Sequence, residues 1–140
     1  MLAASLVDPE ALRRAREAAG VSQAQLARVL GLAGGEVVYN WERGHHAPRE
    51  SLLADLASAL GVELSSILRA GPTDLRRLRV LAGLSVDEAA EAVGVSDVTY
   101  RRWERGLTLR GPNRAAVQVL AGRFGVSVSA VESAARSSVD

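Results

Sequence analysis

The chain contains no cysteine and no lysine among its 140 residues. Without cysteine it can form neither a disulfide nor a cysteine-based zinc site, and it has no thiol nucleophile. Without lysine it cannot form a Schiff base with a carbonyl substrate. The sequence also lacks a G-x-S-x-G turn, a glycine-rich phosphate loop and a clustered pair of acids. We therefore predict that the protein is not an enzyme.

Long hydrophobic runs and a strong charge bias are missing too. No apolar run approaches the roughly 18 to 20 residues that a membrane span needs, and no charged segment precedes an apolar stretch as in a signal peptide. The composition, 48% hydrophobic and 24% charged with a net charge of +1, is that of a soluble globular protein. We expect a cytoplasmic protein with no membrane partner. All 17 basic residues are arginine, which binds phosphate bidentately.

The sequence contains an internal repeat. Trp-Glu-Arg-Gly occurs at residues 41–44 and again at residues 103–106, and each copy closes a run that begins with Leu-Arg-Arg, at Leu12 and at Leu75. The two runs align at an offset of 63, with shifts to 62 and 64 near the tetrapeptide. Such a repeat indicates one supersecondary unit built twice. We predict two domains, residues 1–70 and 71–140, joined at residues 70–73.

Helix signals are dense, whereas strand signals are nearly absent. Asp8 and Pro9 predict a helix over residues 9–19. Ser22 with Gln25, and Ser85 with Glu88, have capping-box spacing and predict second helices that end at Gly31 and Gly94. Further helices are expected at residues 35–43 and 97–105, after Pro48 and Pro112 up to Gly61 and Gly125, and at residues 64–69 and 128–135. The fold class predicted is therefore all-α.

These helices carry the residues of a known family. The first copy reads Arg16-x-x-x-Gly20-x-Ser22-Gln23-x-x-Leu26-Ala27-x-x-x-Gly31 and ends in Trp-Glu-Arg-Gly; the second runs similarly from Arg79 through Gly94-Val95-Ser96. Both copies resemble the Cro/C1-type (XRE) helix-turn-helix domains of phage repressors and bacterial regulators. The resemblance implies two tandem five-helix lambda-repressor-like domains, in each of which the third helix enters the DNA major groove.

The resemblance also implies which side chains face the bases. These are Glu36, Tyr39 and Asn40 in the first unit, and Asp97, Val98, Arg101 and Arg102 in the second. Arginine pairs well with guanine O6 and N7, and asparagine with adenine N6 and N7. Two simpler interpretations remain open. The carboxylates suit the first turn of any helix because of its dipole, and the arginines suit a solvated face.

Contacts to the DNA backbone are expected from the start of the second helix and from the segments around the third. The resemblance assigns them to Gln23, Arg43, His45, His46 and Arg49 in the first unit, and to Ser96, Arg105, Thr108, Arg110 and Arg114 in the second. Val86 stands where Gln23 does, so that contact is missing from the second unit. Adjacent histidines at 45 and 46 invite a metal interpretation. With no third histidine and no cysteine, we expect neither a metal nor a cofactor.

The two copies differ around the third helix. The turn at residues 32–35 is one residue longer than usual, contains paired glycines and lacks the serine cap that Ser96 supplies in the second unit. We therefore expect the second unit to have the more regular recognition helix. By register, Tyr100 replaces the buried apolar Val38. The resemblance further predicts two structural ion pairs, Arg16 with Glu42 and Arg79 with Glu104.

Together these features favour a sequence-specific DNA-binding transcriptional regulator, a repressor, with double-stranded DNA as its partner. An alternative is a protein-interaction module, antitoxin-like or an adaptor, that uses the same fold to dimerise or to bind a partner. The near-neutral charge favours this alternative, whereas two intact repeats with arginine at the groove face oppose it. One chain can act as a pseudo-dimer or can form a homodimer. No small-molecule ligand is evident in the sequence.

Overall fold

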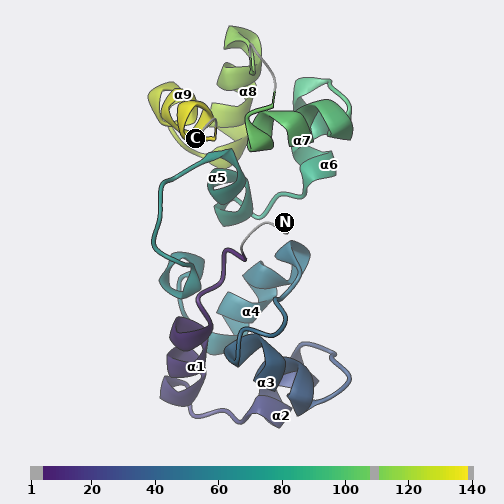
Figure 1. Cartoon of the computed structure of the whole chain (residues 1–140), viewed down its shortest axis with the longest axis vertical. Helices are drawn as coiled ribbons and strands as arrows, with labels where there is room; N and C mark the ends of the chain where they lie inside the picture. Colours follow the sequence, from purple (N-terminus) through teal and green to yellow (C-terminus); the bar gives the residue numbers. More distant parts are fainter. Residues whose placement is uncertain (1–4, 108–110, 139–140) are drawn as a thin grey trace. The chain divides into compact units, whose positions relative to one another are not determined.

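The computed structural model describes residues 5–107 and 111–138. The chain divides into two compact units, Met1–Ala70 (unit 1) and Gly71–Asp140 (unit 2). Over the described ranges the fold is all-α, and the β pairing consists of a single isolated antiparallel bridge between Val7 and Leu68 (Figure 1). None of the described helices combines the length and the apolar character needed to cross a membrane.

The α-helices of unit 1 are α1 (Pro9–Ala18), α2 (Gln23–Val29), α3 (Gly35–Glu42) and α4 (Leu53–Leu60). Asp8 caps α1 by accepting a hydrogen bond from the backbone N–H of Glu10 at 3.0 Å. The capping box of Ser22 and Gln25 is complete at the start of α2.

Two expected helices of unit 1 form differently. The fifth, expected over residues 64–69, is a 3₁₀ helix, Leu64–Ile67, and Leu68 is already extended. The segment is short, has no side-chain cap, and is drawn into the bridge, where Asp8 N–H donates to the Ile67 carbonyl at 2.9 Å. The fourth begins as a 3₁₀ turn, Glu50–Leu52, which also lacks a side-chain cap.

Unit 2 is more regular. Its helices are α5 (Leu75–Leu81), α6 (Val86–Val93), α7 (Asp97–Arg105), α8 (Arg114–Phe124) and α9 (Val128–Ser137). Each has a side-chain N-cap, supplied by Asp74, Ser85, Ser96, Asn113 and Ser127 respectively. Asn113 explains why α8 begins directly as an α-helix, whereas its counterpart α4 follows a 3₁₀ turn. The last helix is two residues longer than the expected 128–135.

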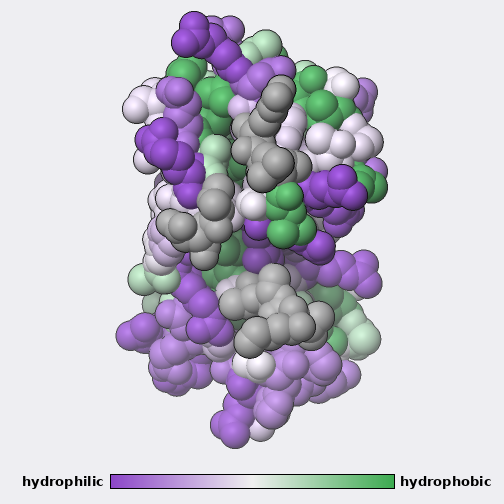
Figure 2. All heavy atoms as spheres, turned by 45° about the horizontal axis from the view of Figure 1, so that its top comes forward, coloured by the Kyte–Doolittle hydropathy of each residue, from purple (hydrophilic) through white to green (hydrophobic). Residues whose placement is uncertain are grey.

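Each unit has its own core. Val38 and Tyr100 occupy equivalent places in the two cores and both are fully buried, which confirms the register inferred from the repeat. The Tyr100 ring meets the Trp103 ring edge-on, with 5.9 Å between centroids. On the face seen in Figure 2, hydrophobic residues form separate spots among hydrophilic ones. The core therefore holds the third helix of each unit by its inner face and leaves the outer face to solvent.

Candidate nucleic-acid interface

Each unit contains a pair of helices joined by a tight turn. In unit 1, α2 packs on α3; in unit 2, α6 packs on α7 (Figure 1). Ser96 caps α7 by accepting from the backbone N–H of Thr99 at 3.1 Å. Its counterpart Gly34 offers no side chain to α3. The α3 helix therefore has no side-chain N-cap, as the sequence predicted.

The backbones of α2 and α3 lie close together at Gly35. A Cβ added there would lie 3.1 Å from the backbone nitrogen and 3.2 Å from the Cα of Ala24. The second glycine of the turn therefore permits a close approach of two helix backbones, a reason distinct from flexibility. The paired glycines predicted a less regular third helix in unit 1, but the sequence did not indicate this packing role.

A buried ion pair joins α1 to the end of α3 in unit 1. Arg16 Nε donates to Glu42 Oε2 at 2.6 Å, and Arg16 Nη2 donates to Glu42 Oε1 at 3.0 Å. The third donor, Nη1, reaches the Val21 carbonyl at 2.9 Å. Its hydrogen bonds with Glu42 raise the pKa of Arg16 above its ordinary value. The pair fixes the end of α3 against α1.

Unit 2 repeats this pair. Arg79 donates from Nε to Glu104 Oε2 at 2.6 Å and from Nη2 to Oε1 at 3.1 Å, and its Nη1 reaches the Leu84 carbonyl at 3.0 Å. The arginine is the more deeply buried here, with 2% of its side chain exposed against 13% for Arg16. The hydroxyl of Tyr100 is buried without a hydrogen-bond partner among the described residues. Burial, with the nearby charge of Glu104, raises the pKa of that phenol far above its usual range.

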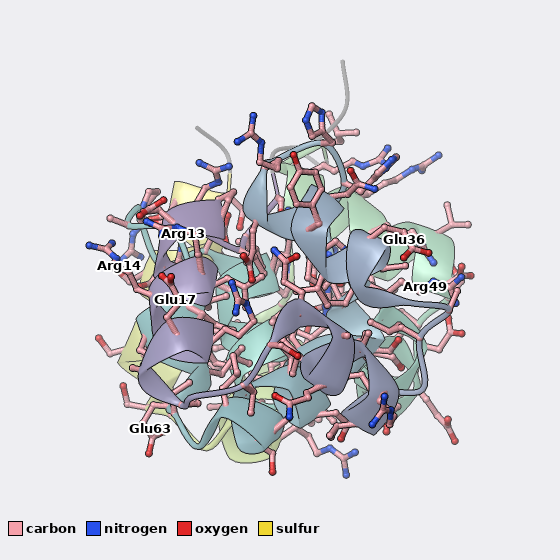
Figure 3. All side chains as sticks on the ribbon, turned by 90° about the horizontal axis from the view of Figure 1, so that it is seen from below. Arg13, Arg14, Glu17, Glu36, Arg49 and Glu63 are labelled. Carbon is pink, nitrogen blue, oxygen red and sulfur yellow. The ribbon has the colours of Figure 1, made fainter. Side chains whose placement is uncertain are left out.

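The outer face of α3 is mixed in charge. Glu36 and Tyr39 are exposed and Asn40 is half-buried. The guanidinium of Arg43 lies 5.8 Å from the centre of the Tyr39 ring, within range of a cation–π interaction. Figure 3 shows Glu36 on the same side of the view as Arg49, whereas Arg13, Arg14 and Glu17 project from α1 on the other side.

The outer face of α7 is more basic. Asp97, Val98, Arg101 and Arg102 are all exposed. Arg101 Nε lies 3.5 Å from an Asp97 carboxylate oxygen, an exposed pair one helical turn apart. The resemblance implies a separate base contact for each residue and does not include this ion pair. Their spacing of four residues along a helix nevertheless favours it. Among the described side chains of α7, Arg102 forms no such ion pair.

The starts of the second helices, α2 and α6, differ between the two units. Gln23 Nε2 donates to Glu42 Oε1 at 3.1 Å, so the amide proposed for a phosphate contact also braces the ion pair. Val86 takes its place in unit 2, followed by Asp87 and Glu88 in the first turn of α6. A hydrogen bond from the Ser85 backbone N–H lowers the pKa of Glu88, which keeps that carboxylate charged. The start of α6 therefore disfavours a phosphate.

The remaining backbone-contact candidates lie on the surface. His45, His46 and Arg49 follow α3 and are exposed, as are Ser96, Arg105 and Arg114 around α7 and α8. Thr108 and Arg110 lie outside the described residues. Within the described part of the chain no three His, Asp or Glu side chains gather into a metal-binding group.

Comparison with known proteins agrees with this geometry. A family model described as helix-turn-helix matches residues 12–67 and matches a second time over residues 75–131. Neither the curated proteins nor the solved structures give a match to this chain.

Proposed function

The chain belongs to the Cro/C1-type helix-turn-helix family of DNA-binding regulators in both of its units, and we propose that it is a sequence-specific transcriptional repressor of the bacterial cytoplasm. The observation that carries the proposal is the outer face of α7. It is a capped, regular third helix that exposes three arginines, at 101, 102 and 105, beside a buried ion pair that fixes its position.

In this proposal unit 2 reads the bases. Arg102 binds guanine through O6 and N7, the pairing that major-groove geometry favours for arginine, while Val98 lies against a base edge. Asp97 and Arg101 act together, because their ion pair orients both side chains. Arg105 and Arg114 contact phosphates, which supply affinity without reading sequence.

Unit 1 contributes chiefly to backbone binding. The first turn of its α2 carries no acidic residue, so a phosphate can approach the N-terminus of that helix. The two acids in the first turn of α6 disfavour the same contact in unit 2. Arg43, His45, His46 and Arg49 extend this contact along the loop after α3. Asn40 is the residue of unit 1 best suited to read a base, an adenine, with Glu36 and Tyr39 beside it.

The operator follows from the difference between the units. Single-unit relatives dimerise to place two recognition helices about 34 Å apart, one turn of DNA. Here two unlike units share one chain, so a monomer should recognise two unlike half-sites. If the chain also forms a homodimer, the operator becomes an inverted pair of such composites.

Selection from random duplex DNA, followed by footprinting of the selected site, tests the proposal. We expect a defined motif, bound about 10³-fold or more tightly than unselected DNA of the same length. Binding should weaken steeply with salt as phosphate counterions are released. Equal affinity for selected and random DNA would remove the proposal in favour of the interaction-module alternative, which the acidic start of α6 and the near-neutral charge support.

A further inference from the structure

Unit 1 contains a cavity of about 370 Å³ beneath the loop that follows α3. Its volume falls within the range of small-molecule sites, roughly 300 to 1,000 Å³. One part of the lining is apolar and is made by Val7, Pro9, Trp41, Ala47 and Pro48. The other part is polar and is made by Ser5, His45, His46 and Arg69. None of the described lining residues is acidic.

The polar part is assembled from both ends of the unit. The bridge between Val7 and Leu68 brings the N-terminal segment alongside the end of the unit. There the backbone N–H of Arg69 donates to the Leu6 carbonyl at 2.6 Å, and Arg69 Nε donates to the Ser5 carbonyl at 3.1 Å. These bonds hold Arg69 at the cavity, which His45 and His46 of the loop after α3 also line.

We propose that this cavity binds a small organic acid, a carboxylate attached to an apolar body. The carboxylate is recognised by Arg69 and the two imidazoles, because a guanidinium and ring N–H groups are carboxylate donors and no acidic side chain in the lining opposes the anion. The apolar body packs against the parts of Trp41 and Pro48 that line the cavity. A bare phosphate carries no apolar group to fill that side, so we commit to the organic acid.

The site would also give the protein a signal, an extension that rests on the proposed function. His45 and His46 line the cavity and belong to the loop proposed to contact DNA phosphates. An acid that engages these imidazoles competes with phosphate for the same donors. By linkage, the acid should lower DNA affinity by the factor by which DNA lowers affinity for the acid. Such an acid would release the repressor from its operator.

Binding is tested on the full chain without DNA, by titration with benzoate observed in ¹H–¹⁵N spectra. The two tryptophan indoles serve as reporters: Trp41 lines the cavity, whereas Trp103 is its repeat partner in unit 2 and is followed by a loop without histidine. We expect a saturable shift at Trp41 only, with a Kd on the order of 1 mM. No saturation at Trp41 by about 10 mM, or equal shifts with uncharged benzyl alcohol or with inorganic phosphate, would overturn the proposal.

Variants locate the anion-binding part. Arg69→Gln should weaken benzoate binding about tenfold, the loss expected for one charged hydrogen bond. Arg14→Gln, which removes an exposed arginine of α1 that is not among the lining residues, is the matched control and should leave benzoate binding unchanged. If Arg69→Gln perturbs the fold of unit 1, the exposed double substitution His45→Asn with His46→Asn replaces it, with the same expected direction. Unweakened binding in the folded variants would contradict the assignment.

Measuring operator affinity with and without benzoate distinguishes the cavity proposal from the proposed function. Saturating benzoate should lower affinity for the selected operator severalfold in the natural chain but not in Arg69→Gln. Benzoate binding by a chain that selects no DNA would sink the proposed function and leave the cavity assignment standing. Operator binding by a chain that ignores benzoate would overturn the cavity assignment alone, and benzoate binding that leaves operator affinity unchanged would overturn the coupling.

Discussion

In unit 1, the ion pair between α1 and α3 is braced by a third side chain, because Gln23 donates to Glu42 at 3.1 Å. In unit 2, Val86 takes the sequence position of Gln23, the hydroxyl of Tyr100 is buried, and the arginine of the pair is more deeply buried. Both copies therefore keep the same two charges, but they differ in how those charges are surrounded. The ion pair is therefore common to both units, whereas the side chains around it differ.

The solvent-facing surfaces diverged in opposite directions. Unit 1 has an uncharged start of α2 and a third helix with a single exposed arginine at its end, Arg43. Unit 2 has two acids in the first turn of α6 and three exposed arginines on α7. Under the proposed function, the uncharged start of α2 suits a phosphate contact and the arginines of α7 suit base contacts. We therefore propose that unit 1 contributes more to affinity and unit 2 more to specificity.

The largest effect should come from breaking the ion pair in unit 2. Arg79→Ala leaves Glu104 buried without its partner, and we expect a loss of about 3 to 5 kcal/mol in the unfolding free energy of that unit. Arg16→Ala should cost less, about 2 to 3 kcal/mol, because Gln23 still donates to Glu42. Urea unfolding followed by NMR signals from each unit separates the two losses.

Arg101→Ala is the control for that measurement. It removes an exposed ion pair with Asp97 and should change stability by no more than about 0.5 kcal/mol. If Arg16→Ala costs as much as Arg79→Ala, Gln23 does not brace the pair, and the first difference between the units disappears.

The next effect concerns which unit reads sequence. Arg102→Ala should cost about 1 to 3 kcal/mol on the selected operator and little on random DNA, because its partner is a base. Asn40→Ala in unit 1 should cost less, since that side chain is half-buried on an uncapped helix. Arg105→Ala is the matched control and should weaken both DNAs alike through a lost phosphate contact. Equal losses on both DNAs for Arg102→Ala would show that this residue does not read a base.

Most of the helix starts could be predicted from interactions between residues close together in the sequence. Caps such as Ser22, Ser85 and Ser96 act within three residues of themselves, so their helix starts could be read directly. Long-range pairing could not: the bridge between Val7 and Leu68, which converts the expected fifth helix of unit 1 into a 3₁₀ turn, joins segments 61 positions apart in the sequence. The cavity at Arg69 depends on that bridge and carries no motif, so the sequence showed no small-molecule site.

Tyr100 provides a smaller, pH-dependent test. Its folded-state pKa is raised by burial, whereas the unfolded phenol titrates near about 10. Above that pH the unfolded state loses a proton that the folded state keeps, so unit 2 should lose about 1.4 kcal/mol per pH unit.

Tyr100→Phe should remove this alkaline slope in unit 2. At neutral pH it should stabilise the unit by about 1 kcal/mol, because a buried hydroxyl without a partner is deleted. Unit-resolved urea unfolding at pH 7 and at pH 11 measures both effects. A variant less stable than the natural chain at pH 7 would show that the hydroxyl has a stabilising partner after all.

The smallest effect should come from giving unit 1 the cap that unit 2 has. Gly34 is in extended backbone, with φ 178° and ψ 177°, which any residue adopts. The three atoms nearest to a Cβ there all belong to the carboxylate end of Glu36, the closest at 2.6 Å, and that flexible, exposed side chain can move away. Gly34→Ser should therefore stabilise unit 1 by about 0.5 to 1 kcal/mol, by restricting the unfolded chain and by capping α3. Gly35→Ala is the matched control and should destabilise the unit, because its Cβ would press on the Ala24 backbone. If both substitutions stabilise unit 1, neither glycine is held by packing, and the two units differ at this turn in flexibility alone.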